Sequence, residues 1–296
     1  MNERKPDRVG QVFAALGKSV CYVALFLGMQ VAVMLPLIVN AVTKMVSGDM
    51  DGAYDLLNAD AMLYTLLSGL LTIAVVLAFY LIRRKKLSEA LWLRPVSTPA
   101  LFSGAAVAPG LYLIIAFALA LLPEAWQESY GEASANLGEV SAVGLIAVVV
   151  VAPVLEEFIF RGLVLNRLSR VMPWWLAVVL SAAVFGACHG HPVWFCYAFV
   201  LGSVFGFIVL RTGSIVPTIL AHVVFNGIGQ VFSAVPETEE GTELLIAIGV
   251  LLAVAIVAPI LDRKGIAALF RSKPKGEGGD EPPAARNTYD YDPWEK

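Results

Sequence analysis

The chain has 296 residues, of which 58% are hydrophobic and 15% are charged, and its mean hydropathy is +0.74. These values exclude an ordinary soluble domain and indicate a polytopic membrane protein. The net charge of −3 is the sum of acidic and basic stretches that nearly cancel, and nothing in it favours a nucleic-acid partner.

Apolar segments recur along most of the chain. A bilayer core needs about 20 mostly apolar residues for each helical span. The sequence therefore predicts an all-α polytopic membrane protein, a bundle of about eight transmembrane helices. The predicted spans are 12–40, 60–82, 99–122, 140–165, 174–190, 192–210, 213–232 and 243–261.

Basic residues predict how the spans are oriented. With the N-terminus in the cytoplasm, the stretches RRKKLSEALWLRP, RGLVLNRLSR and DRKG fall on the cytoplasmic side, together with Arg211. The opposite side receives acidic stretches, and Lys44 is the only one of the 21 Lys and Arg residues there. This positive-inside pattern predicts a multi-pass protein of the plasma membrane with both termini in the cytoplasm. Its basic inner face suits the anionic lipid of a bilayer.

The predicted organisation has three parts. Residues 1–11 are a short cytoplasmic segment, and residues 12–265 form one transmembrane domain. Residues 266–296 are rich in Gly, Pro and charge, so we expect a disordered cytoplasmic tail. Its YDYDPW end is a possible docking motif for a cytoplasmic partner.

Two pairs of small residues predict sites of close helix packing. Gly202 and Gly206 have GxxxG spacing, and Ala182 and Gly186 form a similar pair. Such pairs allow two helix backbones to approach closely.

A few ionisable residues interrupt the predicted spans. A charge in the middle of a transmembrane helix costs about 2.5–3.5 kcal/mol on insertion scales and usually marks a functional site. Glu157 and Arg161 are separated by four residues with the acid first, so pairing between them offsets part of this cost. Glu156 lies about 100° round the helix from Glu157 and is expected to point elsewhere.

Two further spans carry polar residues at the same spacing. His222 and Asn226 are four residues apart on the seventh span, and Phe185 and His189 repeat the spacing on the fifth. Three helices thus present polar side chains to a common interior, as in the polar sites of helix bundles. Counted from the cytoplasmic edges, His189 lies deeper than Glu156. Tilt or a shorter fifth span is needed to bring them together.

The motifs EEFIFR at 156–161, FGACH at 185–189 and HVVFN at 222–226 fit the patterns EExxxR, FxxxH and HxxxN. In this order the sequence resembles the CPBP family. That family comprises the type II CAAX prenyl endopeptidases and bacterial relatives often labelled abortive-infection or bacteriocin-immunity proteins. The resemblance covers residues 140–232, the motif core. It implies an eight-helix membrane bundle that hydrolyses peptide bonds within the membrane.

The resemblance also implies roles for the motif residues. Glu156 and His189 hold and activate the attacking water, and His222 and Asn226 stabilise the tetrahedral oxyanion. This chemistry is physically sound, because water needs a general base and the oxyanion needs preorganised donors. The supporting residues are Glu157, Arg161 and Phe185.

The sequence leaves the part of a metal open. Relatives have been classed both as metalloproteases and as glutamate-dependent enzymes, and HExxH is absent here. Two histidines and a glutamate can bind zinc with water in the fourth position. The candidate zinc ligands are Glu156, His189 and His222.

Two functions of other classes are the alternatives. One is a membrane scaffold or bacteriocin-immunity factor that has the same fold and cleaves nothing. The other is a proton-coupled transporter with Glu156 and His189 as a relay. Inverted repeats would favour a transporter, and the sequence shows none. For an endopeptidase, the expected substrate is a membrane-associated peptide or protein, with or without a prenyl group.

Overall fold

The computed structural model describes residues 8–135, 141–235 and 248–249, and within them every regular element is a helix. Six of these helical segments are long and apolar enough to cross a membrane. Helix α10 (Trp174–Ala187) is a shorter apolar helix at the predicted fifth span. The predicted all-α polytopic fold is confirmed. Apart from positions 248 and 249, two predicted segments lie outside the described residues: the eighth span 243–261 and the tail 266–296.

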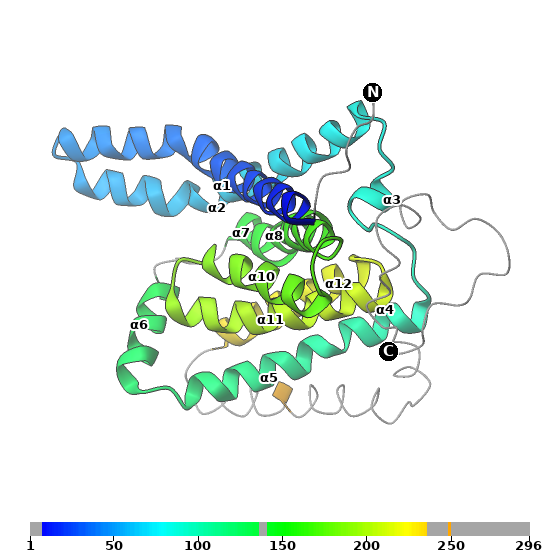
Figure 1. The fold of residues 1–296 in the computed structure, drawn as a ribbon. Helices are drawn as coiled ribbons and strands as arrows, with labels where there is room; N and C mark the ends of the chain where they lie inside the picture. The colour runs from blue at the N-terminus through cyan, green and yellow to red at the C-terminus, as the bar shows by residue number, and fades with distance from the viewer. Residues whose placement is uncertain (1–7, 136–140, 236–247, 250–296) are drawn as a thin grey trace, which may run out of the picture.

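Helices α1 (Arg8–Val46) and α2 (Met50–Ile82) lie side by side as a long hairpin (Figure 1). At 1.5 Å per residue, α1 is about 58 Å long, roughly twice the thickness of a bilayer core. The turn between the helices is short because Asp49 caps α2. Its carboxylate accepts hydrogen bonds from the Gly52 amide at 2.9 Å and from Lys44 Nζ at 2.7 Å. Most of the stretch between the first two predicted spans, 41–59, is helical.

The fourth predicted span is the central segment of the bundle, a single apolar passage of 27 residues. It alternates between α-helical and π-helical hydrogen bonding. All nine residues of η2 are buried, and neighbours from α1, α10 and α11 contact it. Its elements are α7 (Ala142–Ile146), η1 (Ala147–Val151), α8 (Ala152–Glu156), η2 (Glu157–Leu165) and α9 (Asn166–Leu168).

The remaining helices pack around this segment. The third predicted span is divided at Ala106 into α4 and α5, both of which contact α12 (Figure 1). Two helices, α3 and α6, are too short or too polar to cross a membrane. The bounds are α3 (Leu87–Ala90), α4 (Thr98–Ala105), α5 (Val107–Ala120), α6 (Glu124–Ala135), α11 (Pro192–Thr212) and α12 (Val216–Ser233).

Small residues bring α10 and α11 into close contact, as predicted. A Cβ atom added to Gly202 would lie 3.1 Å from the Cβ of Ala182. A Cβ atom added to Gly186 would lie 2.9 Å from the backbone oxygen of Phe195. Backbone thus faces backbone at Gly186, and a larger residue there forces the two helices apart.

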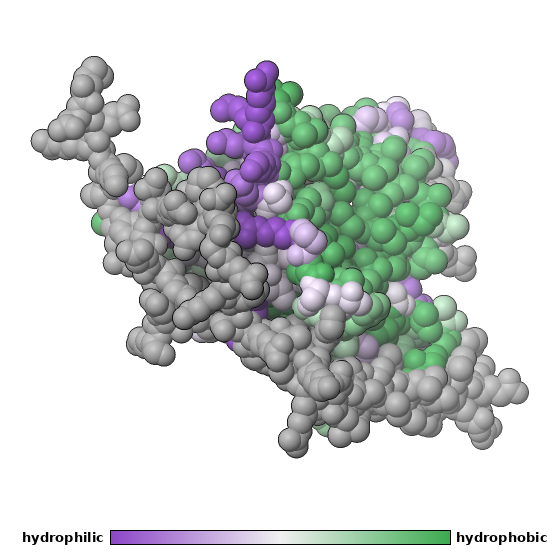
Figure 2. Space-filling view, turned by 90° about the vertical axis from the view of Figure 1, so that its right-hand side faces the viewer, coloured by the Kyte–Doolittle hydropathy of each residue, from purple (hydrophilic) through white to green (hydrophobic). Residues whose placement is uncertain are grey.

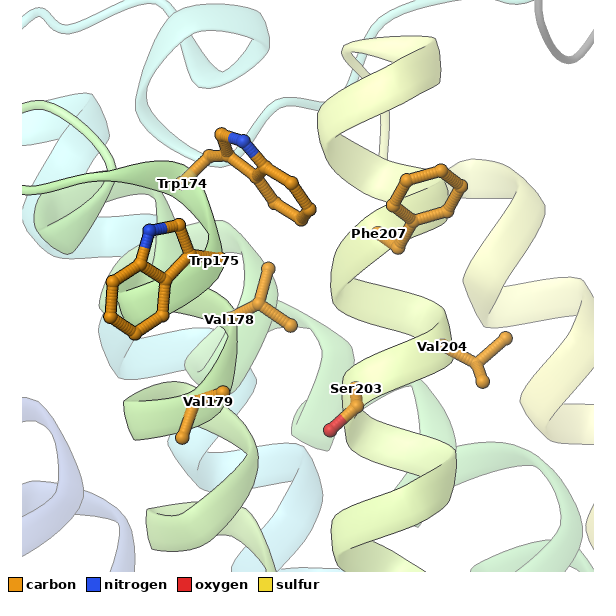
Figure 3. A pocket seen from close by; sticks show the side chains of 7 residues that line it. All are labelled: Trp174, Trp175, Val178, Val179, Ser203, Val204 and Phe207. Carbon is orange, nitrogen blue, oxygen red and sulfur yellow. The ribbon is translucent and has the colours of Figure 1, made fainter. Parts of the chain in front are cut away.

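The surface of the bundle is apolar over a wide face, with hydrophilic residues along its edge (Figure 2). An apolar hollow of about 340 Å³ lies between α10 and α11. The Ser203 hydroxyl in its wall donates to the Phe199 carbonyl at 2.8 Å, so the hollow presents hydrocarbon (Figure 3). It has no titratable side chain and is not a site for acid–base chemistry. Its lining residues are Trp174, Trp175, Val178, Val179, Ser203, Val204 and Phe207.

The same substitution at two glycines tests this packing. Gly186→Ala should lower the free energy of unfolding by about 1–3 kcal/mol, the usual cost of overpacking. Gly17, on α1, has nothing within 4 Å of an added Cβ. Gly17→Ala should therefore be neutral or slightly stabilising. Unfolding in detergent micelles measures both, and equal effects at the two positions would contradict the packing described.

Candidate functional site

Glu157 and Arg161 form a buried ion pair in the central segment. Glu157 Oε1 lies 3.0 Å from Arg161 Nη1, and the two side chains are 0% and 1% exposed. The pairing predicted from their spacing is confirmed. A buried ion needs such a partner, because its transfer out of water costs several kcal/mol.

Aromatic rings complete the surroundings of Arg161. Its guanidinium carbon lies 4.4 Å from the centre of the Phe185 ring and 5.7 Å from that of Phe205. A desolvated cation–π contact of this kind contributes about 2 kcal/mol. The phenylalanine of the FGACH motif therefore supports the arginine of the EEFIFR motif.

His222 connects the two glutamates. Its Nδ1 lies 3.2 Å from Glu157 Oε1 and its Nε2 lies 3.5 Å from Glu156 Oε2. The imidazole is 3% exposed and the Glu156 side chain 19%. Glu156 was expected to point away from Glu157, yet the two carboxylates reach opposite nitrogens of one ring. The Nδ1 contact is a hydrogen bond, and an imidazolium form of the ring would also carry a proton on Nε2, toward Glu156.

His189 lies in the turn after α10, which ends at Ala187. The predicted fifth span, 174–190, is therefore too long at this end. His189 Nδ1 lies 2.8 Å from the Phe185 carbonyl. A carbonyl only accepts, so Nδ1 carries the proton and Nε2 of the neutral ring is an acceptor. The Phe185 ring contacts the imidazoles of both His189, at 4.8 Å, and His222, at 6.0 Å.

Asn226 ties α12 to the central segment. Its Nδ2 donates to the Val148 carbonyl at 2.9 Å. The amide of Ala152, at the end of η1, donates to the Ala147 carbonyl, five residues before it. The same spacing would pair the Val148 carbonyl with an amide of residue 153. That residue is Pro153, which has no amide proton. The Asn226 side chain therefore satisfies a backbone carbonyl that the proline leaves without its helical donor.

The sequence did not predict the π-helical turns or their side-chain partners. Ser181 of α10 donates to the Phe160 carbonyl of η2 at 2.9 Å. Such wide turns are rare and often occur at functional sites. Two features of the sequence could have indicated these contacts: Pro153 lies inside an apolar span, and Ser181 is a hydroxyl residue in the apolar run of α10.

The candidate zinc ligands do not form a metal site in this arrangement. Among the described residues, no group of three or more His, Cys, Asp and Glu side chains is placed to hold a metal ion. Both nitrogens of His222 lie near carboxylates, Nδ1 at 3.2 Å from Glu157 and Nε2 at 3.5 Å from Glu156. We therefore derive no chemical step through a metal.

A double-mutant cycle at Glu157 and Arg161 tests the buried pair. Arg161→Met alone should destabilise the protein by about 3–5 kcal/mol, because it leaves the Glu157 carboxylate buried without its partner. Glu157→Gln added to Arg161→Met should recover part of this loss. Unfolding in detergent micelles gives the four free energies. Strict additivity of the two single effects would contradict a direct pair.

A second cycle tests the tie between Asn226 and Val148. Asn226→Ala should cost about 0.6–1.7 kcal/mol of unfolding free energy, the range for hydrogen bonds between membrane helices. The cost should shrink in a Pro153→Ala background, where residue 153 supplies an amide proton to Val148. Ser203→Ala is the control, because its hydroxyl bonds only within its own helix. An unchanged cost in the Pro153→Ala background would contradict this assignment.

The motif core matches the model of a peptidase family and is similar to a putative membrane peptidase. Residues 138–228 match the model of the family described as type II CAAX prenyl endopeptidase Rce1-like. Over 94 residues the chain is 32% identical to the Bacillus subtilis (strain 168) protein named "Putative membrane peptidase YdiL". This alignment spans 31% of the chain and 38% of that protein. No solved structure matches the chain. All three motifs lie within the family match, and the resemblance to type II CAAX prenyl endopeptidases is thus confirmed for residues 138–228.

Proposed function

We propose that this protein is an intramembrane endopeptidase that hydrolyses a peptide bond of a membrane-associated peptide or protein. One observation carries the proposal: Glu156 and Glu157 reach opposite nitrogens of His222 inside the region that matches a peptidase family. Two carboxylates and an imidazole in contact within an apolar bundle are costly to keep. They are also the groups that hydrolysis of a peptide bond requires.

The two glutamates have different roles because their exposure differs. The Glu157 side chain is 0% exposed and is held by Arg161 and His222. The Glu156 side chain is 19% exposed, so water can reach it. Glu156 is the general base, and Glu157 is a positioning residue that orients the imidazole.

The reaction follows from these assignments. Glu156 takes a proton from water as the water oxygen bonds to the carbonyl carbon, and the carbonyl π electrons move to its oxygen. His189 Nε2 accepts the second water proton in a hydrogen bond. The tetrahedral intermediate collapses, the carbon–nitrogen bond breaks, and Glu156 returns its proton to the leaving nitrogen.

Two donors stabilise the oxyanion of the intermediate. In its imidazolium form, His222 directs Nδ1–H at Glu157 and presents Nε2–H on the side of Glu156. Asn226 has two amide protons. One is donated to Val148, which fixes the amide group, and the other donates to the oxyanion. Preorganised donors of this kind contribute about 100- to 1000-fold each in rate.

A comparison of protein N-termini in cells tests the proposal. Cells with the native chain should contain termini that are absent from cells with Glu156→Gln, because this change removes the base and keeps the side-chain volume. Once a substrate is known, its cleavage in proteoliposomes should fall by at least about 100-fold in the variant. Glu128→Gln, at an exposed position on α6, is the matched control.

Two results would contradict an endopeptidase. Identical sets of termini, with both proteins equally abundant in the membrane, would favour a scaffold or immunity factor without cleavage. Proton flux into liposomes that Glu156→Gln abolishes would favour a transporter.

A further inference from the structure

The segment between α2 and α4 is fastened across one end of the bundle. Leu91, at its middle, is 0% exposed within the core. Asn166 of the central segment donates to the Ala90 carbonyl at 3.1 Å. Ser214, between α11 and α12, donates to the Arg94 carbonyl at 2.6 Å. Three stretches that the charge pattern assigned to the cytoplasmic side therefore meet at one end.

These stretches carry three arginines, Arg94, Arg167 and Arg170, and the charges of Arg94 and Arg167 both act on Arg170. Arg170 Nε donates to Asn166 Oδ1 at 3.0 Å, and Arg94 Nε lies 3.3 Å from the Ser88 carbonyl. Both side chains are thus fixed through Nε to neutral acceptors, which leaves their paired Nη groups directed elsewhere. Within the part of the chain that the structure describes, the ion pairs include none of the three arginines.

The cluster carries excess positive charge. Burial lowers the pKa of the Arg170 guanidinium, and the nearby charges of Arg167 and Arg94 lower it further. Tyr80 and then Glu89 act in the opposite direction, but the Glu89 carboxylate lies 3.8 Å from Lys86 Nζ and is shared with it. Like charges held together in this way are unfavourable unless an anion joins them.

We propose that Arg94, Arg167 and Arg170 form a binding site for a phosphate group. The planar guanidinium group can donate two parallel hydrogen bonds to phosphate oxygens. The guanidinium groups of Arg94 and Arg170 are already held in place by their Nε contacts. The site is at the end of the bundle where α2 and the central segment finish, so the headgroup of an anionic phospholipid can reach it. A soluble phosphate compound offers the same chemistry. The site shares no residue with the three motifs.

Two variants with equal loss of charge test the site. Arg167→Gln/Arg170→Gln removes two cations of the cluster. Arg84→Gln/Lys85→Gln removes two exposed cations beside it, at the end of α2. Native mass spectrometry of the full chain in detergent, with phosphatidylglycerol or phosphatidylcholine of equal chain length, measures lipid binding. Native protein should prefer phosphatidylglycerol, and the cluster variant should lose at least about fivefold in affinity while the control changes by less than about twofold.

A second arm identifies the source of the phosphate. If inorganic phosphate stabilises the native protein against heat, and the cluster variant loses this effect without any change in lipid binding, the ligand is a soluble phosphate compound. Equal loss of lipid binding in both double variants would overturn the site and indicate a diffuse basic surface. So would the absence of both lipid preference and phosphate stabilisation. Should the double variant fold poorly, Arg167→Gln alone keeps the bond between Arg170 and Asn166 and should show the same losses in smaller measure.

Discussion

Burial of the Glu157–Arg161 pair is the constraint on which the rest of the site depends. Two ions in an apolar bundle lose several kcal/mol of hydration each, and a simple pair rarely recovers that loss. Here the guanidinium also lies on the Phe185 ring, and the carboxylate also contacts His222. The pair therefore draws α10 and α12 to the central segment. His222 is thereby fixed between the two glutamates, where the proposed chemistry at Glu156 needs it.

Backbone hydrogen bonding imposes a second constraint on the same segment. A membrane interior offers no water to an unpaired carbonyl, so each one needs a donor from the protein. Pro153 and the π-helical turns change which carbonyls are satisfied within the helix. Asn226 and Ser181 supply donors from α12 and α10 to the carbonyls of Val148 and Phe160. The same two neighbours that hold the charges thus hold the backbone.

Much of this arrangement could be predicted from residue spacing. The apolar runs predicted the spans, and the four-residue interval between Glu157 and Arg161 predicted their pairing, because helical geometry is local. Three features depend on contacts between helices and were not predicted. They are the wide turns of the central segment, the early end of α10 before His189, and the bond from Asn226 to Val148. The cluster around Arg170 was visible only as general basic charge, since the Asn166 bonds that assemble it join residues far apart in sequence.

The proposed hydrolysis and the burial of the ion pair make opposite demands on neighbouring residues. A buried ion pair is strongest where water is excluded, whereas a general base acts only where water arrives. Glu156 and Glu157 separate these demands within one helical step, because one side chain is 19% exposed and the other 0%. His222 couples them, since each of its nitrogens faces one carboxylate. Loss of Glu157 should therefore affect both the stability of the protein and the placement of the proton on His222. Loss of Glu156, the partly exposed glutamate, should affect the proposed hydrolysis with little change in the stability of the protein.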